Sequence, residues 1–242
     1  PEEYAEARST TLNAHYTPQE IIDAMYDAIS ATDLPRNARI LEPSCGTGNF
    51  ISRLPNRFRD CKVTGIEIDP ITSQIAESLN SDNDNVKIFN CGFEHADLDN
   101  DSFDLAIGNV PFGDYKMIDP DFTKDYNIHD AFFRRALNKV APGGIVAFIT
   151  SSGTLDKKNP QVREHLATYG DLVGAIRLPD NAFASAGTKV TTDIIFLQKR
   201  EIPLQPFDRK PDWCYTAPDK NGLMINSYFV QNPNMVLGNM EK

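Results

Sequence analysis

Hydrophobic residues along the chain form short β-branched runs that alternate with stretches in which apolar residues recur at helical spacing. This alternation is typical of a parallel sheet with crossover helices. It predicts strands at Arg39–Glu42, Lys62–Ile68, Val86–Asn90, Phe103–Gly108, Gly144–Thr150, Leu172–Leu178 and Thr191–Lys199. Helices are predicted at Pro18–Ile29, Gly48–Leu54, Pro70–Leu79, Asp130–Val140 and Gln161–Thr168. The predicted fold class is α/β, a seven-stranded, mostly parallel sheet with helices on both faces.

The C-terminal part of the chain departs from this alternation. Between the last two predicted strands, Pro179–Lys189 is rich in turn-forming residues and has no helical pattern, so these two strands are expected to pair as an antiparallel hairpin. After Arg200 the sequence is rich in proline and asparagine, which favours a linker. The expected organisation is an N-terminal helical segment at 1–35, an α/β domain at 36–200 that carries the motifs below, and a linker or tail at 201–242 towards a domain outside this chain.

Composition limits the class of protein. Of the 242 residues, 40% are hydrophobic, which is enough to bury a core. No apolar run approaches the roughly 18 residues of a membrane span and no signal peptide is visible, so a cytoplasmic protein is expected. The four cysteines and four histidines show no ligand spacing, so free thiols and no metal site are expected. The net charge of −10 argues against a broad basic surface for nucleic acid.

A glycine-rich turn follows the first predicted strand. Gly46 and Gly48 lie between a strand and a helix, where glycines let a ligand approach the backbone closely. Ile51 replaces the third glycine of a dinucleotide-binding fingerprint, and no Lys-Ser/Thr pair follows, which excludes a P-loop. About 20 residues on, Glu67 ends the next strand where a ribose diol needs an acceptor, whereas Asp69 is expected to cap the following helix.

The fourth predicted strand leads directly into Asn109-Val110-Pro111-Phe112. This tetrapeptide resembles the Asn-Pro-Pro-Tyr/Phe motif of amino-group methyltransferases. The resemblance implies that the Asn109 side-chain oxygen and the Val110 carbonyl accept the two hydrogens of an exocyclic amine, which directs its lone pair at a methyl sulfonium. It also implies that Phe112 stacks on a target base flipped out of the duplex, with Pro111 completing the catalytic motif. Because only a carbonyl acts at position 110, valine is expected to serve as well as the usual proline.

A second motif precedes the first predicted helix. Tyr16-Thr17-Pro18 resembles the (Phe/Tyr)-Thr-Pro motif that lies over the methionine end of the cofactor in γ-type adenine methyltransferases. The order of the motifs along the chain is also the γ order. Thr17-Pro18-Gln19-Glu20 has, in addition, the sequence of a helix capping box. Both interpretations of the Thr17 side chain are compatible and stay open.

The resemblance extends over residues 14–200 and implies a class I S-adenosylmethionine-dependent, Rossmann-like methyltransferase fold that methylates adenine N6 in DNA. The second half is similar to the catalytic subunit of type I restriction–modification systems and to the methylase domains of large methylase–helicase proteins of mobile elements. The segments that carry this similarity are His129–Phe133, Gly143–Ile149, Arg163–Leu166, Ile176–Phe183 and Thr191–Leu197. The implied cofactor is S-adenosyl-L-methionine, and its binding residues are Tyr16, Thr17, Glu42, Ser44, Gly46, Gly48, Glu67, Ile68 and Phe93.

One position departs from the family pattern. After the third strand the family usually has Asp-Phe, in which the aspartate holds the adenine amine of the cofactor. Here the sequence is Gly92-Phe93-Glu94, so the aromatic residue is kept and the acceptor at position 92 is lost. Glu94 is a candidate replacement for it.

Other functions use the same motif type. Ribosomal-RNA guanine-N2 methylation and protein-glutamine methylation are alternatives, and a non-catalytic methyltransferase-fold module is a third. The expected partner is DNA, bound weakly by this chain alone because a small rim of lysines is all that offsets its negative charge. That rim would consist of Lys116, Lys124, Lys157, Lys158 and Lys189. Sequence-specific recognition is expected to come from a specificity subunit or from a flanking helicase or target-recognition domain, with no membrane involved.

Overall fold

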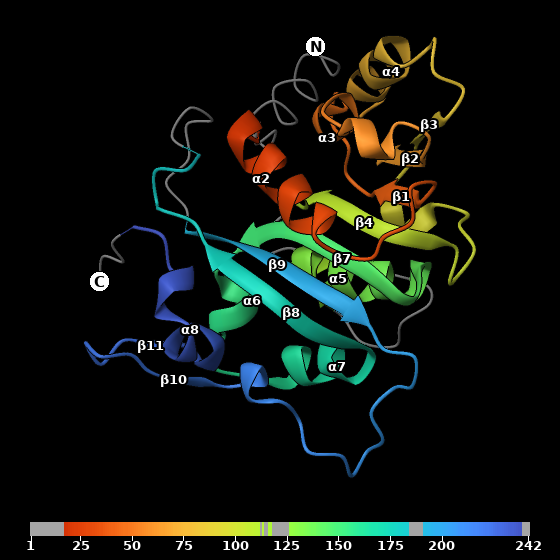
Figure 1. Ribbon diagram of the computed structural model, residues 1–242. Helices are drawn as coiled ribbons and strands as arrows, with labels where there is room; N and C mark the ends of the chain where they lie inside the picture. Colours follow the sequence, from red (N-terminus) through yellow and green to blue (C-terminus); the bar gives the residue numbers. More distant parts are fainter. Residues whose placement is uncertain (1–16, 112, 114–115, 118–125, 184–190, 239–242) are drawn as a thin grey trace.

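A seven-stranded sheet forms the centre of the computed structural model, which describes residues 17–111, 113, 116–117, 126–183 and 191–238. The strand order is β3-β2-β1-β4-β7-β9-β8, and β9 is antiparallel to both of its neighbours (Figure 1). The predicted C-terminal hairpin is therefore confirmed, with β9 inserted between β7 and β8. The strands are β1 Arg39–Glu42, β2 Lys62–Glu67, β3 Val86–Asn90, β4 Phe103–Asn109, β7 Val140–Ser151, β8 Gly170–Arg177 and β9 Thr192–Lys199.

Helices cover both faces of the sheet because alternate strand residues point to opposite sides. Ile40 and Leu105 pack in one core cluster with residues of α2 Gln19–Ser30, α3 Asn49–Ser52 and α4 Pro70–Leu79. Leu41 and Ala106, the next residues along, pack in a second cluster with residues of α5 Ile128–Lys139 and α7 Gln161–Tyr169. Figure 1 shows α2 and α5 on opposite sides of the sheet. The predicted helices are thus all present.

The start of α4 shows how the local sequence sets an element boundary. Asp69 has an extended backbone, and its carboxylate accepts a hydrogen bond from the Thr72 N–H at 2.8 Å. Pro70 occupies the first helical position, where the missing N–H has no partner to lose. The prediction that Asp69 caps this helix is confirmed.

The strand order reverses between β1 and β4. The chain builds the sheet outward from β1 through β2 to β3, then returns to β4 on the other side of β1. Ligands of open α/β sheets bind at the carboxyl ends of strands where the order reverses in this way. Glu42 and Asn109 are the last residues of β1 and β4, so both lie at this edge.

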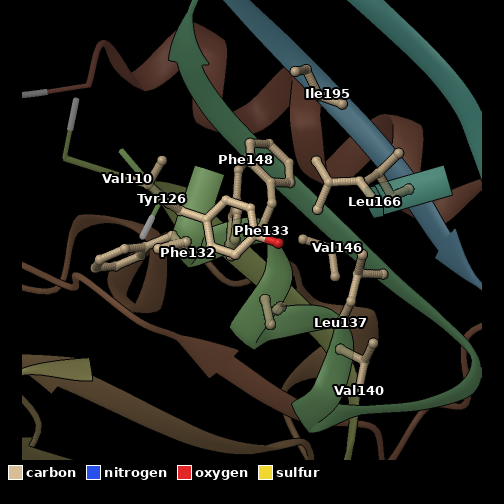
Figure 2. Close-up of a cluster of buried hydrophobic side chains, with 14 of the residues drawn as sticks. Val110, Tyr126, Phe132, Phe133, Leu137, Val140, Val146, Phe148, Leu166 and Ile195 are labelled. Atoms are coloured by element: carbon tan, nitrogen blue, oxygen red, sulfur yellow. The ribbon is translucent and has the colours of Figure 1, made fainter. Parts of the chain in front are cut away.

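The second core cluster extends to the first residue after β4. Val110 is 1% exposed and belongs to the same buried cluster as Phe132 and Tyr126, and Figure 2 shows these three side chains at one end of it. Deeper in the cluster the rings of Phe133 and Phe148 meet edge to face, with centroids 5.2 Å apart. The start of the motif after β4 is therefore part of a core cluster with residues of α5 and β7.

Part of the C-terminal segment, which its composition predicts as a linker, packs in the core. Trp213, Ile225 and Phe229 are buried in the second core cluster, although they lie beyond Arg200. Residues 211–236 form five short elements, η4 Asp212–Cys214, the hairpin β10 Thr216–Pro218 with β11 Met224–Asn226, α8 Ser227–Gln231, and η5 Pro233–Met235. Of these, β11 packs against α6 Gly153–Asp156 and η4 packs against α7. A second small hairpin, β5 Lys116–Met117 with β6 Tyr126–Asn127, was also absent from the predicted elements.

Buried polar side chains hold this segment in place. The Arg163 guanidinium donates to the carbonyls of Cys214 at 2.7 Å and Lys157 at 2.6 Å. Asn226 is fully buried, and its amide donates to the Leu155 carbonyl at 2.9 Å and the Trp213 carbonyl at 2.8 Å. These bonds satisfy carbonyls that apolar packing alone would leave unpaired.

We predict that Asn226→Ala lowers the free energy of unfolding by at least about 2 kcal/mol, because it leaves two buried carbonyls without a donor. Urea unfolding followed by circular dichroism measures the change. The matched control is Asn221→Ala in the exposed β10–β11 turn, which should stay within about 0.5 kcal/mol of the parent. Equal stabilities of the two variants would show that the segment contributes no cooperative packing.

Candidate active site at the carboxyl ends of the strands

The glycine turn after β1 is held between two other strands. Its Cys45 N–H donates to the Ile66 carbonyl of β2 at 2.9 Å, and the Ser44 hydroxyl donates to the Asn109 carbonyl of β4 at 2.9 Å. Gly46 and Gly48 have φ values of +55° and +85°, a conformation that side chains disfavour. A Cβ at Gly46 would meet no atom within 4 Å, so the backbone here borders open space that a ligand can enter.

Glu67 occupies the position predicted for a ribose acceptor and also has a structural role that the sequence did not indicate. Its Oε2 accepts from the Gly46 N–H at 2.9 Å, and its Oε1 accepts from the Asp69 N–H at 2.8 Å. The carboxylate thus ties the glycine turn to the turn that starts α4. A carboxylate has about four lone-pair sites, so two acceptor directions remain for ligand hydroxyls.

Glu42 is a buried acid at the end of β1. The residue is 2% exposed, and its Oε2 has no hydrogen-bond partner among the described residues. Burial, and then the nearby charge of Glu67, raise the pKa of Glu42 well above its usual range. An acceptor oxygen without a donor in a buried position fits a ligand that carries a donor, such as an ammonium group.

Asn109 connects the motif after β4 to the N-terminal motif. Its Nδ2 donates to the Thr17 hydroxyl oxygen at 3.1 Å, across 92 residues of sequence. Thr17 is buried, and α2 begins at Gln19 without a side-chain cap. The capping-box interpretation of Thr17 is therefore wrong. This bond orients the Asn109 amide, because a donating Nδ2 leaves Oδ1 as the atom that accepts.

Of the other motif residues, the structure describes Val110 and Pro111. Tyr16 and Phe112, predicted to contact cofactor and target base, lie outside the described residues. Val110 differs from a proline in one respect, because its N–H donates to the Ile149 carbonyl of β7 at 3.2 Å. A proline has no N–H and could not form this bond. Valine and proline therefore differ at position 110, although the sequence suggested that they are equivalent. Pro111 follows as a half-buried residue.

Two predicted cofactor contacts at the ends of β2 and β3 have opposite environments. Ile68 is 68% exposed, which makes its side chain an accessible apolar surface beside Glu67. Phe93 is only 2% exposed, and its ring packs against Phe132 at 5.2 Å between centroids, with the Arg135 guanidinium over it. Phe93 is therefore a core residue in this structure, and its aromatic contact with the cofactor stays a prediction.

Asn90 is a site residue that the sequence analysis missed. Its Nδ2 donates to the carbonyls of Glu67 at 2.9 Å and Ile68 at 3.0 Å. It therefore fixes the backbone from which the Glu67 and Ile68 side chains project. The only signal in the sequence is an asparagine at a predicted strand end, which is also common in ordinary turns.

The predicted lysine rim is smaller than expected. The Lys157 ammonium forms an ion pair with the buried Asp130 carboxylate and contacts the His129 ring nitrogen at 3.1 Å, so its charge is locally compensated. Lys158 and Lys116 are exposed. The remaining two predicted members, Lys124 and Lys189, lie outside the described residues.

Two negative findings concern the described ranges. In these ranges no group of three His, Cys, Asp or Glu side chains is arranged to hold a metal ion. The helices that the structure describes include none with the length and apolar character needed to cross a bilayer.

We predict that Glu42→Gln becomes more stable relative to the parent as the pH rises above the ordinary pKa of a glutamate. Because the pKa of Glu42 is raised in the folded parent, the unfolded chain releases this proton at a lower pH than the folded one, so the parent loses stability between the two pKa values and the glutamine variant does not. Thermal unfolding at several pH values measures the difference. The control is Glu77→Gln on the exposed face of α4, and identical pH curves for Glu42→Gln and the parent would contradict the prediction.

Comparison with known proteins relates this site to a family. Defense against restriction protein B of Escherichia phage P1 is 29% identical over 195 residues, which make up 78% of this chain and 8% of the phage protein. Type II methyltransferase M.CvrRI of Paramecium bursaria Chlorella virus XZ-6E is 30% identical over 193 residues, or 76% of this chain and 48% of that protein. The chain thus spans half or less of the length of these relatives.

Solved structures of methyltransferases share the fold of this chain. A solved modification subunit, attributed to a type I restriction enzyme of Vibrio vulnificus YJ016, superposes with a TM-score of 0.65 at 19% identity, covering 92% of this chain and 52% of that one. The fold is that of class I S-adenosylmethionine-dependent methyltransferases. A family model described as N-6 DNA methylase matches residues 2–213, which include the glycine turn, Glu67 and Asn109. With the strand order and these motifs in place, the chain belongs to the N-6 DNA methylase family.

Proposed function

We propose that this chain contains the cofactor-binding and catalytic part of an enzyme that transfers the methyl group of S-adenosylmethionine to adenine N6 in DNA. The observation that carries the proposal is the position of Asn109. Its backbone carbonyl accepts from Ser44 of the glycine turn, and its side chain donates to Thr17. A residue of the amine-binding type is thereby joined directly to two predicted cofactor-binding elements.

The residues at the carboxyl ends of β1 and β2 suit this cofactor. Glu67 offers its remaining acceptor directions to the ribose hydroxyls, and Ile68 offers an apolar surface to the adenine ring. The buried Glu42 carboxyl lacks a donor for Oε2, which suits the amino group of the methionine part. S-adenosylmethionine supplies a methyl group activated by a positively charged sulfur.

The protein's part in the reaction is to prepare the amine. The lone pair of an adenine amine is delocalised into the ring, which makes the nitrogen a poor nucleophile. Asn109 Oδ1 and the Val110 carbonyl accept its two hydrogens, so the nitrogen becomes pyramidal and its lone pair points towards the methyl group. With the cofactor bound, its methyl group would pass to this nitrogen while the electron pair of the carbon–sulfur bond stays on sulfur, and the methylated amine would then release a proton to water. No strong general base is needed.

The surroundings of Val110 support this assignment. Its N–H is fixed to the Ile149 carbonyl, and the Asn109 carbonyl of the same peptide group accepts from Ser44. Because the Val110 side chain is also buried in the core, the residue whose carbonyl is proposed to act is held in a defined position. Preorganised acceptors of this kind stabilise a transition state without reorganising during the reaction. Phe112, the next residue but one, is proposed to stack on the target base.

Recognition of a DNA sequence is proposed to come from outside this chain. Phosphate neutralisation provides most of the affinity for DNA, and the net charge of −10 with few exposed lysines near the site gives little of it. A specificity subunit or a flanking domain would supply both the affinity and the base contacts.

We predict that Asn109→Ala lowers the rate of methyl transfer at least about a hundredfold, the usual cost of removing one preorganised polar contact from a transition state. Binding of S-adenosylhomocysteine, measured by calorimetry, should change less than about threefold, because Asn109 contacts the amine and not the cofactor. Transfer of tritiated methyl groups to duplex DNA, ribosomal RNA and release factor measures the activity and its substrate class. Full activity of the variant on DNA would refute the motif assignment, and transfer to RNA or protein alone would refute the DNA substrate.

We predict that Thr17→Val lowers kcat about tenfold at saturating cofactor, because the Asn109 amide loses the acceptor that orients it and one such hydrogen bond is worth about 1.4 kcal/mol. Thr17→Ser keeps the hydroxyl and should retain kcat within about threefold. The comparison is made under single-turnover conditions with both variants fully loaded with cofactor. Equal rates for valine and serine at this position would show that the contact has no part in catalysis.

A further inference from the structure

Thr192 is a buried polar residue that the packing around it does not explain. It is the first residue of β9 and is 1% exposed, yet its hydroxyl has no hydrogen-bond partner among the described residues. A buried hydroxyl without a partner costs free energy relative to an apolar side chain of the same shape, such as valine. A threonine here therefore indicates that the hydroxyl gains a partner when the protein binds a ligand.

Thr192 is paired across the sheet with Ser151, the last residue of β7. The next pair along, Ser152 and Thr191, is joined by a bond from the Ser152 N–H to the Thr191 carbonyl at 3.0 Å. Bonded and non-bonded pairs alternate between antiparallel strands, so Ser151 and Thr192 form a non-bonded pair, in which the Cα atoms are only about 4.5 Å apart and the side chains are close. Ser151 is half-buried, so it is the accessible member of this hydroxyl pair.

Ser151 faces the same side of the sheet as the Asn109 side chain. β7 lies between β4 and β9 (Figure 1), and the β4–β7 register pairs Asn109 with Ile149, two residues before Ser151. Residues two apart in a strand share a face, and Asn109 uses this face to bind Thr17. One strand across and two residues along correspond to about 8 Å between the Cα atoms of Asn109 and Ser151. A base whose amine is bound at Asn109 is therefore within reach of the Ser151 hydroxyl.

The chemistry of adenine indicates what the hydroxyl pair binds. A flipped base is read on its Watson–Crick edge, where the N6 amine of adenine donates and the adjacent ring nitrogen N1 accepts. In the proposed function Asn109 and Val110 accept from the amine, so N1 needs a donor beside them. A serine hydroxyl donates one hydrogen bond and has two acceptor lone pairs. Ser151 can therefore donate to N1 and at the same time accept from the Thr192 hydroxyl.

We propose that the Ser151 hydroxyl donates a hydrogen bond to N1 of the target adenine, and that Thr192 is a positioning residue whose hydroxyl donates to the Ser151 oxygen. This inference rests on the proposed function, because it adds contacts to the base that Asn109 binds. Ser151 selects a base that carries an acceptor next to its amine. The buried Thr192 hydroxyl gains a partner in the arrangement in which Ser151 points at the base.

The test compares adenine with 1-deazaadenine, which keeps the amine and has a C–H group in place of N1. A random-sequence duplex pool that contains both bases in equal amounts is methylated with S-adenosylmethionine, and mass spectrometry of the nucleosides gives the ratio of the two products. The intrinsic reactivities of the two amines are the same for every variant, so a change in this ratio measures the contact to N1. Ser151→Ala should lower the preference for adenine about tenfold, as the loss of one hydrogen bond predicts. Its binding of S-adenosylhomocysteine, measured by calorimetry, should equal that of the parent.

Two variants of Thr192 test the positioning residue. Thr192→Val should lower the preference for adenine about threefold, whereas Thr192→Ser keeps the hydroxyl and should have the parental preference. Because the Thr192 hydroxyl has no partner among the described residues, the Tm of Thr192→Val should be no lower than that of the parent. A structural role predicts the opposite, a lower Tm with an unchanged preference, and that result would overturn the role of Thr192.

Ser152→Ala, at the next residue of the chain, is the matched control and should keep the parental preference. A second pool contains adenine and 7-deazaadenine, which retains N1, so its product ratio should be the same for Ser151→Ala and the parent. If Ser151→Ala keeps the parental preference in the first pool, or changes the ratio in the second pool instead, the contact to N1 is overturned and the proposed function stands. A parent protein that methylates no base in either pool would overturn the proposed function as well.

Discussion

The arrangement of the site depends on the two hydrogen bonds that the Glu67 carboxylate accepts. One oxygen holds the Gly46 N–H of the glycine turn and the other holds the Asp69 N–H at the start of α4. Charge-assisted bonds of this kind are stronger than neutral ones, and here they replace the side-chain packing that a glycine turn lacks. With the turn fixed on the β2 side, Ser44 can reach the end of β4 and bind the Asn109 carbonyl. The glycine turn and the residue proposed to bind the amine are thereby joined by hydrogen bonds.

The same edge of the sheet concentrates acidic groups, which has opposite consequences for the two proposed ligands. Glu42 and Glu67 are the last residues of β1 and β2, Glu94 lies shortly after β3, and proximity to Glu67 contributes to the raised pKa of Glu42. The negative charge of Glu67 favours a cofactor with a sulfonium and an ammonium group. It disfavours a DNA backbone, and Lys157 is already paired with Asp130. The chemistry and the affinity for DNA are thus best served by different parts of a larger assembly.

Much of the fold could be predicted because local patterns reported it directly. The alternation of apolar residues located the seven strands, since each inner strand packs against helices on both faces and its residues must suit burial. Asp69-Pro70 marked the start of α4, because a cap and a first-turn proline act within one turn of helix. The glycine turn and Asn109 were identified from short motifs at predicted strand ends, where the fold itself brings them together. The packing of residues 211–236 was missed, because Trp213, Ile225 and Phe229 are scattered among prolines and asparagines and lack any periodic pattern.

The sequence by itself determined the α/β class, the sheet of seven strands and the motifs at its carboxyl edge, because these depend on periodicity and on neighbouring residues. Only the tertiary structure decided how individual side chains are used. Thr17 binds Asn109 instead of capping α2, Phe93 packs in the core, and Glu94 folds over Gly92. Each of these outcomes depends on the distance between groups on different elements, or on which volume a neighbouring side chain has left open. Neither quantity is encoded in the local pattern, so a motif can name the residues of a site without giving the contacts they make.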